Sequence, residues 1–435
     1  AIWLATESGR SLITSLLMSF RFLPSKDSDL APKRPHVSPE VINFVSTLGL
    51  SSPISLSAMP KLHLFYPEND IALASDLPRF TAPRAALDLH IAGETLAMFT
   101  GNPGDKFLTQ GVSAEWFDRV SEAFALSVMP FNGDSRGLSP SPWGWSRASR
   151  TVFADSGFTP DALPTDAALS RMRQLSHRRT ALQLAAALPD LVAPPGIEAF
   201  TVDEALAAVE AYSGAVVKSP WSSSGRGVIY SASTSPEMLA QRIAGTIGRQ
   251  GSVIVERFYP DIVDFALLYE ADGANITFTG YSFFAHDAHF RYSGSMLAPD
   301  SVLKSAIEQA AGSQLPDGLE QAVAAALYGI IGTDYTGLLG VDMMALRLSG
   351  SGRPGPQLAI AEVNLRNTMG HVAHTLAARF LAPGTTGRYT VEPRRNPQPL
   401  TPPQRPLRDP PKIRGGPHPP PAGPPLPPPP PNPPP

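Results

Sequence analysis

The stretch Leu358-Ala-Ile-Ala-Glu-Val-Asn-Leu-Arg366 alternates apolar and polar side chains, which is the period of a β-strand with one buried face. The alternation places Glu362, Asn364 and Arg366 on one face and the apolar residues between them on the other. Oxygen ligands two residues apart can hold a hard cation, and an arginine one step further can bind phosphate oxygens. We therefore predict that Glu362 and Asn364 bind Mg²⁺ or Mn²⁺ beside a phosphate held by Arg366.

A partner strand is predicted just upstream, at Gly340–Leu348, and a turn rich in Gly, Ser and Pro connects the two. Such a connection predicts an antiparallel hairpin in which Asp342 faces Glu362 and Asn364. These polar groups are costly to bury without a cation, so Asp342 is the third predicted metal ligand. The alternative is a solvated sheet face, which the apolar flanking residues disfavour.

A second motif predicts a phosphate-binding loop. Val216 and Val217 form an apolar strand that ends at Lys218, and a turn of serines and glycines follows. Backbone N–H groups and hydroxyls in such a turn can surround phosphate oxygens, while lysine and arginine supply positive charge. A Walker loop is excluded because Gly-Lys-Ser/Thr is missing, and a plain hairpin remains the alternative. The predicted nucleotide-binding residues of this turn are Ser222, Ser223, Ser224, Gly225, Arg226 and Gly227.

A third motif is the apolar strand Ser252–Phe258, which carries Glu256 near its end. A segment of this kind can line an adenine pocket, with the carboxylate bonding the ribose. By itself it is an ordinary strand end.

The composition limits the classes of protein and site. The 435 residues include no cysteine, which excludes disulfides and thiolate metal sites, and the formal net charge is −3. This charge gives no indication of a nucleic-acid or membrane surface. No apolar run reaches the roughly 18–20 residues that a membrane helix needs. A cytoplasmic protein is expected.

Predicted helices cover Ala168–Ala187, Ser235–Gly248 and a segment opened by the capping box at Thr201.

Proline and glycine suggest where the chain divides. The 48 prolines concentrate in the C-terminal segment, which predicts a disordered tail over residues 389–435, with an SH3-type ligand as the alternative. Residues 1–58 show no sustained period and are expected to be a poorly ordered extension. Between them we expect an α/β unit at 59–165, a second unit at 166–258 and a third at 259–388 that holds the metal site.

Together these motifs resemble the ATP-grasp superfamily, over roughly Ser176 to Arg379. Glu362-Val-Asn-Leu-Arg366 is close to the Glu-x-Asn-x-Arg of carbamoyl phosphate synthase and biotin carboxylase relatives. The segments Pro67-Glu-Asn-Asp70 and Lys218-Ser-Pro-Trp-Ser-Ser-Ser-Gly-Arg-Gly227 look like those of a bacterial group of ATP-grasp proteins. The resemblance implies a mixed α/β (α+β) protein: an ATP-grasp fold of two α+β subdomains, preceded by a small Rossmann-like pre-ATP-grasp domain.

The resemblance also implies roles for individual residues. Arg178 and Lys218 would be the two cations on the nucleotide phosphates, with the Ser222–Gly227 turn as a flap over them. Glu256 would lie at the adenine and ribose, and Asp264 would match an acidic position just beyond. Two departures are an arginine as first cation, within His177-Arg-Arg179, and Asp342 where glutamate is commoner. Metal binding by Asp342, Glu362 and Asn364, and catalysis by Lys218 and Arg366, complete the implied site.

Most of this superfamily joins a carboxylate to an amine through an acyl phosphate. The resemblance therefore implies an ATP- and Mg-dependent carboxylate–amine ligase whose partners are ATP, a small acid and an amine. The alternatives are a small-molecule kinase of the same fold and a nucleotide-binding module without turnover. Self-association into a homo-oligomer is left open. Candidates for the acceptor site are Asn69, Arg291 and Tyr292, whereas His371 and His374 are expected to be ordinary helix residues.

Overall fold

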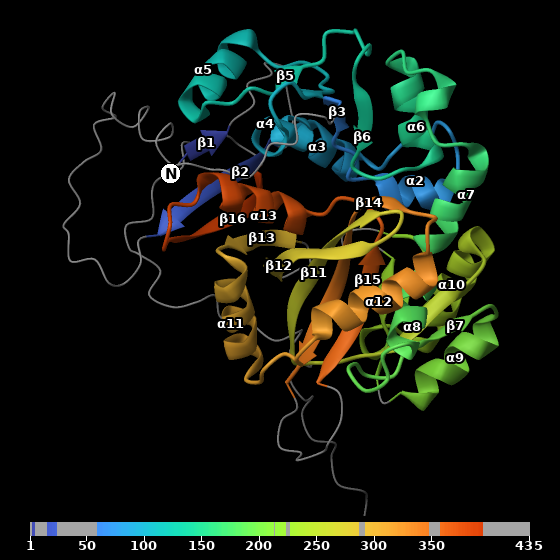
Figure 1. The fold of residues 1–435 in the computed structure, drawn as a ribbon. Helices are drawn as coiled ribbons and strands as arrows, with labels where there is room; N and C mark the ends of the chain where they lie inside the picture. Colours follow the sequence, from blue (N-terminus) through green and yellow to red (C-terminus); the bar gives the residue numbers. More distant parts are fainter. Residues whose placement is uncertain are drawn as a thin grey trace, which may run out of the picture.

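A computed structural model describes residues 2–4, 15–23, 59–212, 214–222, 227–286, 292–347 and 357–394 of the chain. They form a mixed α/β protein with three sheets, two of four strands and one of eight. Figure 1 shows the first four-stranded sheet and its helices at the top and the second at the lower right, with the large sheet between. In the described part of the chain, no helix combines the length and apolar character needed to cross a membrane.

The first unit is a parallel sheet with strand order β5-β4-β3-β6. This is the doubly wound, Rossmann-like arrangement that was expected before the other two units. Its strands lie around a core that includes Leu62, Phe99 and Phe107. Its elements are β3 (Lys61–Leu64), α2 (Asn69–Ser75), α3 (Arg84–Gly93), η1 (Glu94–Leu96), α4 (Ala97–Thr100), β4 (Lys106–Phe107), α5 (Ala114–Phe124), β5 (Met129–Pro130), β6 (Ser139–Pro142), α6 (Arg147–Asp155) and η2 (Pro160–Ala162).

The second unit contains a small antiparallel sheet of order β7-β10-β8-β9. Helices α9 and α10 supply apolar side chains such as Ala205 and Ile243 to its core. Helix α8 instead packs on β15 of the large sheet and on α12. Its elements are α7 (Asp166–Leu175), α8 (Arg179–Ala186), β7 (Ile197–Ala199), α9 (Val202–Ala211), β8 (Ala215–Lys218), β9 (Val228–Tyr230), η3 (Ser231–Ser233), α10 (Pro236–Gln250) and β10 (Val253–Arg257).

The third unit is built on the large antiparallel sheet, of order β1-β2-β16-β13-β12-β11-β14-β15. Helices α11 and α12 pack on it and bury Ile307, Val323 and Leu327. Its elements are β1 (Ile2–Leu4), β2 (Ser15–Leu23), β11 (Ile262–Asp272), β12 (Ile276–His286), β13 (Tyr292–Leu297), α11 (Asp300–Ala311), α12 (Leu319–Ile331), β14 (Thr336–Leu346), β15 (Leu358–Asn364), α13 (Met369–Phe380) and β16 (Thr386–Arg394).

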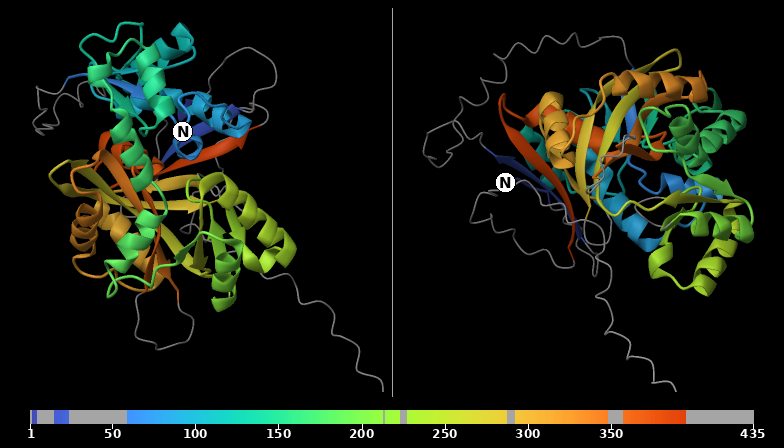
Figure 2. Two further views of the ribbon diagram at one scale, coloured as in Figure 1. Left: turned by 90° about the vertical axis from the view of Figure 1, so that its right-hand side faces the viewer. Right: turned by 90° about the horizontal axis from the view of Figure 1, so that it is seen from below.

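Helix α13 ties the first unit to the large sheet. It follows β15 directly and begins after Thr368, whose hydroxyl accepts the backbone N–H of His371. Val372, Ala373 and Leu376 of this helix belong to the same buried cluster as the core of the first unit. The left view of Figure 2 shows the first unit above, with the large sheet and the small-sheet unit beneath it. The C-terminal end of β15 therefore lies beside the first unit.

Most predicted elements appear, with two differences. The helix expected over Ala168–Ala187 is two helices, α7 and α8, interrupted at residues 176–178, where Arg178 donates a hydrogen bond to the loop after β8. Strands β1 and β2 lie within the segment expected to be a poorly ordered extension, and β2 pairs with β16. The predicted tail beyond residue 394 lies outside the described residues.

Candidate active site

The predicted hairpin is confirmed as β14 and β15, which pair in antiparallel register. Asp342 lies opposite Glu362, and Gly340 lies opposite Asn364. The register shifts between Asp342 and Met343, which leaves Ala361 as an extra residue on β15. Such a bulge leaves a residue out of the ladder, and bulges are frequent beside active sites. Here it coincides with a carbonyl oxygen, that of Ala361, which accepts a hydrogen bond from outside the sheet.

The carboxyl group of Asp342 is buried close to that of Glu362, and this changes its pKa. Burial, and then the neighbouring charge of Glu362, raise the pKa of Asp342 to about 7. Arg366, the Asn364 amide and His286 act in the opposite direction but do not cancel the increase. The Asn364 Nδ2 group donates to Asp342 Oδ2 at 3.0 Å. Burial and the neighbouring carboxylate thus disfavour the charged form of Asp342, one of the residues predicted to bind a metal.

Arg178 lies at the break between α7 and α8 and reaches both sides of the site. Its Nε donates to the carbonyl of Ser219 at 3.0 Å, and its Nη2 donates to the hydroxyl of Ser222 at 3.1 Å. Nη2 also lies 3.1 Å from Glu362 Oε1 on β15. The Arg178 side chain is only 7% exposed, so these contacts hold it almost completely out of solvent. Arg178, and not its neighbour in sequence, is the arginine of the site: Arg179 pairs with Glu198.

Lys218 ends β8 and is paired within the site. Its Nζ lies 2.5 Å from Glu256 Oε2 on β10 and donates to the carbonyl of Ala361 on β15 at 3.3 Å. Both side chains of the ion pair are mostly buried, at 12% and 13% exposure. Lys218 and Glu256, predicted from separate motifs, therefore contact each other. Asp264, the further acidic position, instead lies 3.2 Å from His286 Nδ1.

Trp221, at the base of the predicted flap, is held in place by contacts to its indole ring and to its backbone. The guanidinium of Arg173 stacks 3.8 Å from the indole centroid, and His177 approaches the ring edge-on. Gln250 exchanges two hydrogen bonds with the Trp221 backbone. Gly227 closes the turn at φ +73°, and its carbonyl accepts the Ser219 N–H. The predicted flap residues Ser223, Ser224, Gly225 and Arg226 lie outside the described residues.

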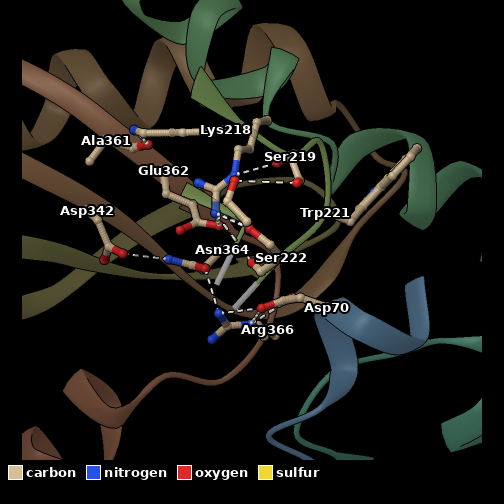
Figure 3. Close-up of polar contacts among 12 residues, drawn as sticks. Asp70, Lys218, Ser219, Trp221, Ser222, Asp342, Ala361, Glu362, Asn364 and Arg366 are labelled. Carbon is tan, nitrogen blue, oxygen red and sulfur yellow. Dashed lines mark hydrogen bonds and ion pairs between the residues drawn. The ribbon is translucent and has the colours of Figure 1, made fainter. Parts of the chain in front are cut away.

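A residue of the first unit joins this group. Arg366 donates to both oxygens of Asp70 on α2, at 2.8–3.1 Å, and to Asn364 Oδ1 at 2.8 Å. Figure 3 shows the resulting series of contacts from Asp342 through Asn364 and Arg366 to Asp70. The Asp70 contact was not predicted. The available signal was its place in the polar turn after the first strand of an α/β unit, which is where such units often bind ligands.

These side chains enclose a small cleft. Its cavity volume of about 10 Å³ is roughly the space that a single water molecule needs. A ligand as large as a nucleotide therefore requires side chains here to separate. The lining residues are Asp70, Ser176, Pro220, Trp221, Ser222, Glu362, Val363, Asn364, Leu365 and Arg366.

Three residues were predicted as candidates for the site that binds the acceptor substrate. Tyr292 hydrogen-bonds Ser295 at 2.7 Å. His371, which was expected to be an ordinary helix residue, is buried in α13 beside Thr368. Arg291 lies outside the described residues. Asn69 is 1% exposed and adjoins Asp70 in α2. Of the acceptor candidates, Asn69 thus lies next to a residue that lines the cleft.

The donor set fits a hard cation only in part. Among the described residues, no group of three His, Asp or Glu side chains is placed to hold a metal. The site offers the two carboxylates of Asp342 and Glu362, whose mutual repulsion a cation would relieve. The third predicted ligand, Asn364, uses its amide oxygen to accept from Arg366. Metal binding by Asn364 would require that hydrogen bond to be exchanged.

Comparisons with known proteins add a likeness in fold. No protein-family model matches the chain, and none of the curated proteins matches its sequence. Among solved structures, the chain is similar to a RimK domain protein ATP-grasp from Sphaerobacter thermophilus, at 20% identity and a TM-score of 0.32. That match covers 63% of this chain and 98% of the other. The chain resembles ATP-grasp proteins.

Two further similar structures are synthetases. N5-carboxyaminoimidazole synthetase from Staphylococcus aureus, complexed with ADP, is 13% identical, with a TM-score of 0.38 and coverage of 74% of this chain and 78% of that one. D-alanyl-alanine synthetase A from Vibrio cholerae is 17% identical, with a TM-score of 0.33. The chain matches 56% of that protein's length over 45% of its own. Similarity at this level does not establish a reaction, so the function rests on the site of this chain.

Proposed function

We propose that this chain is an ATP- and Mg²⁺-dependent ligase that activates a carboxylate as an acyl phosphate for attack by an amine. One observation carries the proposal. The carboxylates of Asp342 and Glu362 on the β14–β15 hairpin lie beside two cations: Arg178 Nη2 is 3.1 Å from Glu362 Oε1, and Lys218 Nζ donates to the Ala361 carbonyl of the same strand. Carboxylates for a divalent cation facing cations for phosphates are the groups that phosphoryl transfer from ATP requires.

Each cationic side chain of the site forms an ion pair with a carboxylate of the protein. Arg178 pairs with Glu362, Lys218 with Glu256 and Arg366 with Asp70. Of the carboxylates of the site, Asp342 is the one that forms no ion pair among the described residues, and its partner is the Asn364 amide. The side chains thus neutralise one another while the cleft remains narrow.

Nucleotide binding would exchange these partners. The anionic triphosphate would take Arg178 and Lys218, and the carboxylates of Glu362 and Asp342 would turn to the cation that accompanies it. Bound Mg²⁺ supplies positive charge to the phosphate oxygens. Arg178, Lys218 and Glu362 each leave one opposite charge for another in this exchange, and Glu256, which loses Lys218, becomes free to accept a hydrogen bond from the ribose. The exchange also opens the cleft, whose present volume is too small for a nucleotide.

In the proposed reaction, an oxygen of the substrate carboxylate forms a bond to the γ-phosphorus of ATP, and the bond from that phosphorus to ADP breaks. The amine nitrogen then attacks the acyl carbon, phosphate leaves, and the nitrogen loses a proton. The chain positions the reacting groups and stabilises charge, which is the main contribution of proteins to phosphoryl transfer. Arg366, two residues after β15, would steady the transferred phosphoryl group.

Calorimetry with MgATP, followed by an assay of ADP release against pools of acids and amines, tests the proposal. Hydroxylamine added to the acid pools should trap an acyl phosphate as a hydroxamate. A kinase would instead yield ADP and a phosphorylated alcohol, with no hydroxamate. Failure of the full chain to bind MgATP would remove the proposal altogether.

A further inference from the structure

The end of β15 meets the first unit where a doubly wound sheet commonly binds ligands. In the order β5-β4-β3-β6, the direction of winding reverses between β3 and β6. Ligands of such sheets bind outside the carboxyl ends of the strands at that point. The segment after β3 carries Asp70, and the segment after β6 carries Gly144. Both segments contact the residues that follow β15 on the large sheet.

The contact between the two units is close. The Asn367 N–H donates to the Trp143 carbonyl at 2.7 Å. A Cβ atom added at Gly144 would lie 2.5 Å from Asn69 Nδ2 and 2.9 Å from Arg366 Cβ. Only glycine leaves room for these side chains at that position. The first unit therefore fixes the backbone and the stem of Arg366, as well as its charged end.

The guanidinium of Arg366 lies near three carboxylates: that of Asp70 and those of Glu362 and Asp342 on the hairpin. Burial opposes the charged form of Arg366, yet Asp70 and then Glu362 and Asp342 raise its pKa above the ordinary value. The geometry shows which carboxylate holds it. The ion pair with Asp70 is bidentate, and its side chains are 16% and 13% exposed. Arg366 makes no ion pair with Glu362 or Asp342 among the described contacts.

From these contacts we infer that Asp70 is a positioning residue of the proposed ATP site. It holds the Arg366 guanidinium away from Asp342 and Glu362 and in place for the γ-phosphoryl group. This inference rests on the proposed function. Without the Asp70 charge, the guanidinium would turn toward the hairpin carboxylates, because opposite charges attract strongly in a partly buried cleft. It would then be lost to the γ-phosphoryl group.

The test compares two nucleotides on the full chain by calorimetry in Mg²⁺. MgADP lacks the γ-phosphoryl group, and a non-hydrolysable MgATP analogue has it, so the ratio of their dissociation constants reports the contribution of that group. The Asp70→Asn variant keeps the size of the side chain and removes its charge. We expect its MgADP affinity to stay within about threefold of wild type. Its preference for the ATP analogue should fall by about tenfold, the loss expected for one charge-assisted contact.

Two further variants make the test specific. Asp70→Glu restores the charge and should recover part of the lost preference for the ATP analogue. Asp155→Asn is the matched control: Asp155 ends α6 of the same unit, pairs with Arg79 at 2.8 Å and is not among the residues lining the cleft. It should bind both nucleotides as wild type does.

The remaining outcomes contradict the inference or the proposed function separately. If Asp70→Asn keeps the wild-type preference, whether both affinities are unchanged or both are weakened equally, the ion pair only holds the two units together and the inference is wrong. It is equally wrong if wild type binds both nucleotides equally well, because Arg366 then contributes nothing to the γ-phosphoryl group. Wild type that binds neither nucleotide overturns the proposed function instead.

Discussion

The Lys218 Nζ group donates a hydrogen bond to the carbonyl of Ala361, which joins the end of β8 in the small sheet to the bulge of β15 in the large one. The same nitrogen lies 2.5 Å from Glu256 Oε2. Lys218 is thus the point at which the two sheets meet through a charged group. A nucleotide phosphate bound to Lys218 would replace two hydrogen-bond acceptors, the Glu256 carboxylate of the small sheet and the Ala361 carbonyl of the large one.

Lys218→Ala should weaken MgATP binding by at least about tenfold, because a hydrogen bond to a charged group contributes about 1.5–3 kcal/mol. Calorimetry measures this directly. Lys304→Ala is the matched control, since Lys304 also pairs with a glutamate, at 3.4 Å, and that glutamate, Glu320, is not a residue of the site. Equal affinities in the two variants would show that Lys218 does not contact the nucleotide.

Glu362→Gln should abolish Mg²⁺-dependent turnover while the fold is retained. Glutamine keeps an oxygen for the hydrogen bond from Arg178 but no longer carries the charge that binds a divalent cation. ADP release across a Mg²⁺ titration, together with thermal unfolding, measures both properties. Glu270→Gln, on the exposed face of β11 in the same sheet, should leave both unchanged. Wild-type turnover in Glu362→Gln would remove the metal assignment.

The hairpin of the site could be predicted because its information is local. Alternation along Leu358–Arg366 and the position of Asp342 are enough to place these side chains on one face. The interruption at Arg178 could not be predicted, because the periodicity of α7 continues into α8 and the contact between Arg178 and Ser219 joins residues that are 41 positions apart. Asp70 was missed for a related reason: it lies 296 residues from Arg366 in the chain.

The stability of the protein should fall with acid through His371. Burial lowers the pKa of His371 to about 4, below its ordinary value of 6.5. The unfolded chain therefore binds a proton first as the pH falls. The contribution of neutral His371 is fully present above about pH 6.5 and is lost between about pH 6.5 and 4, up to about 3 kcal/mol.

Denaturant unfolding at pH 7.5 and pH 5 measures this dependence, and His371→Gln should make it less steep. Some slope should remain, because burial also lowers the pKa of His177 to about 4. If His371→Gln shows the same loss of stability between the two pH values as wild type, His371 is not the buried neutral histidine that its contacts indicate.

Gly144→Ala should separate the first unit from the end of β15. The added Cβ would lie 2.5 Å from Asn69 Nδ2 and 2.9 Å from Arg366 Cβ. Neither side chain can move away freely, because Asn69 is buried and Arg366 is paired with Asp70. Overpacking of this kind costs about 1–3 kcal/mol. We therefore expect a lower unfolding temperature together with reduced MgATP affinity, because Arg366 must shift. Gly248→Ala is the matched control: it lies in α10, and no atom beyond its neighbours comes within 4 Å of an added Cβ. Alanine should stabilise that helix by roughly 0.5–1 kcal/mol and leave nucleotide binding unchanged. Tolerance of alanine at position 144, with wild-type unfolding and binding, would mean that the two units do not meet as closely as these distances require.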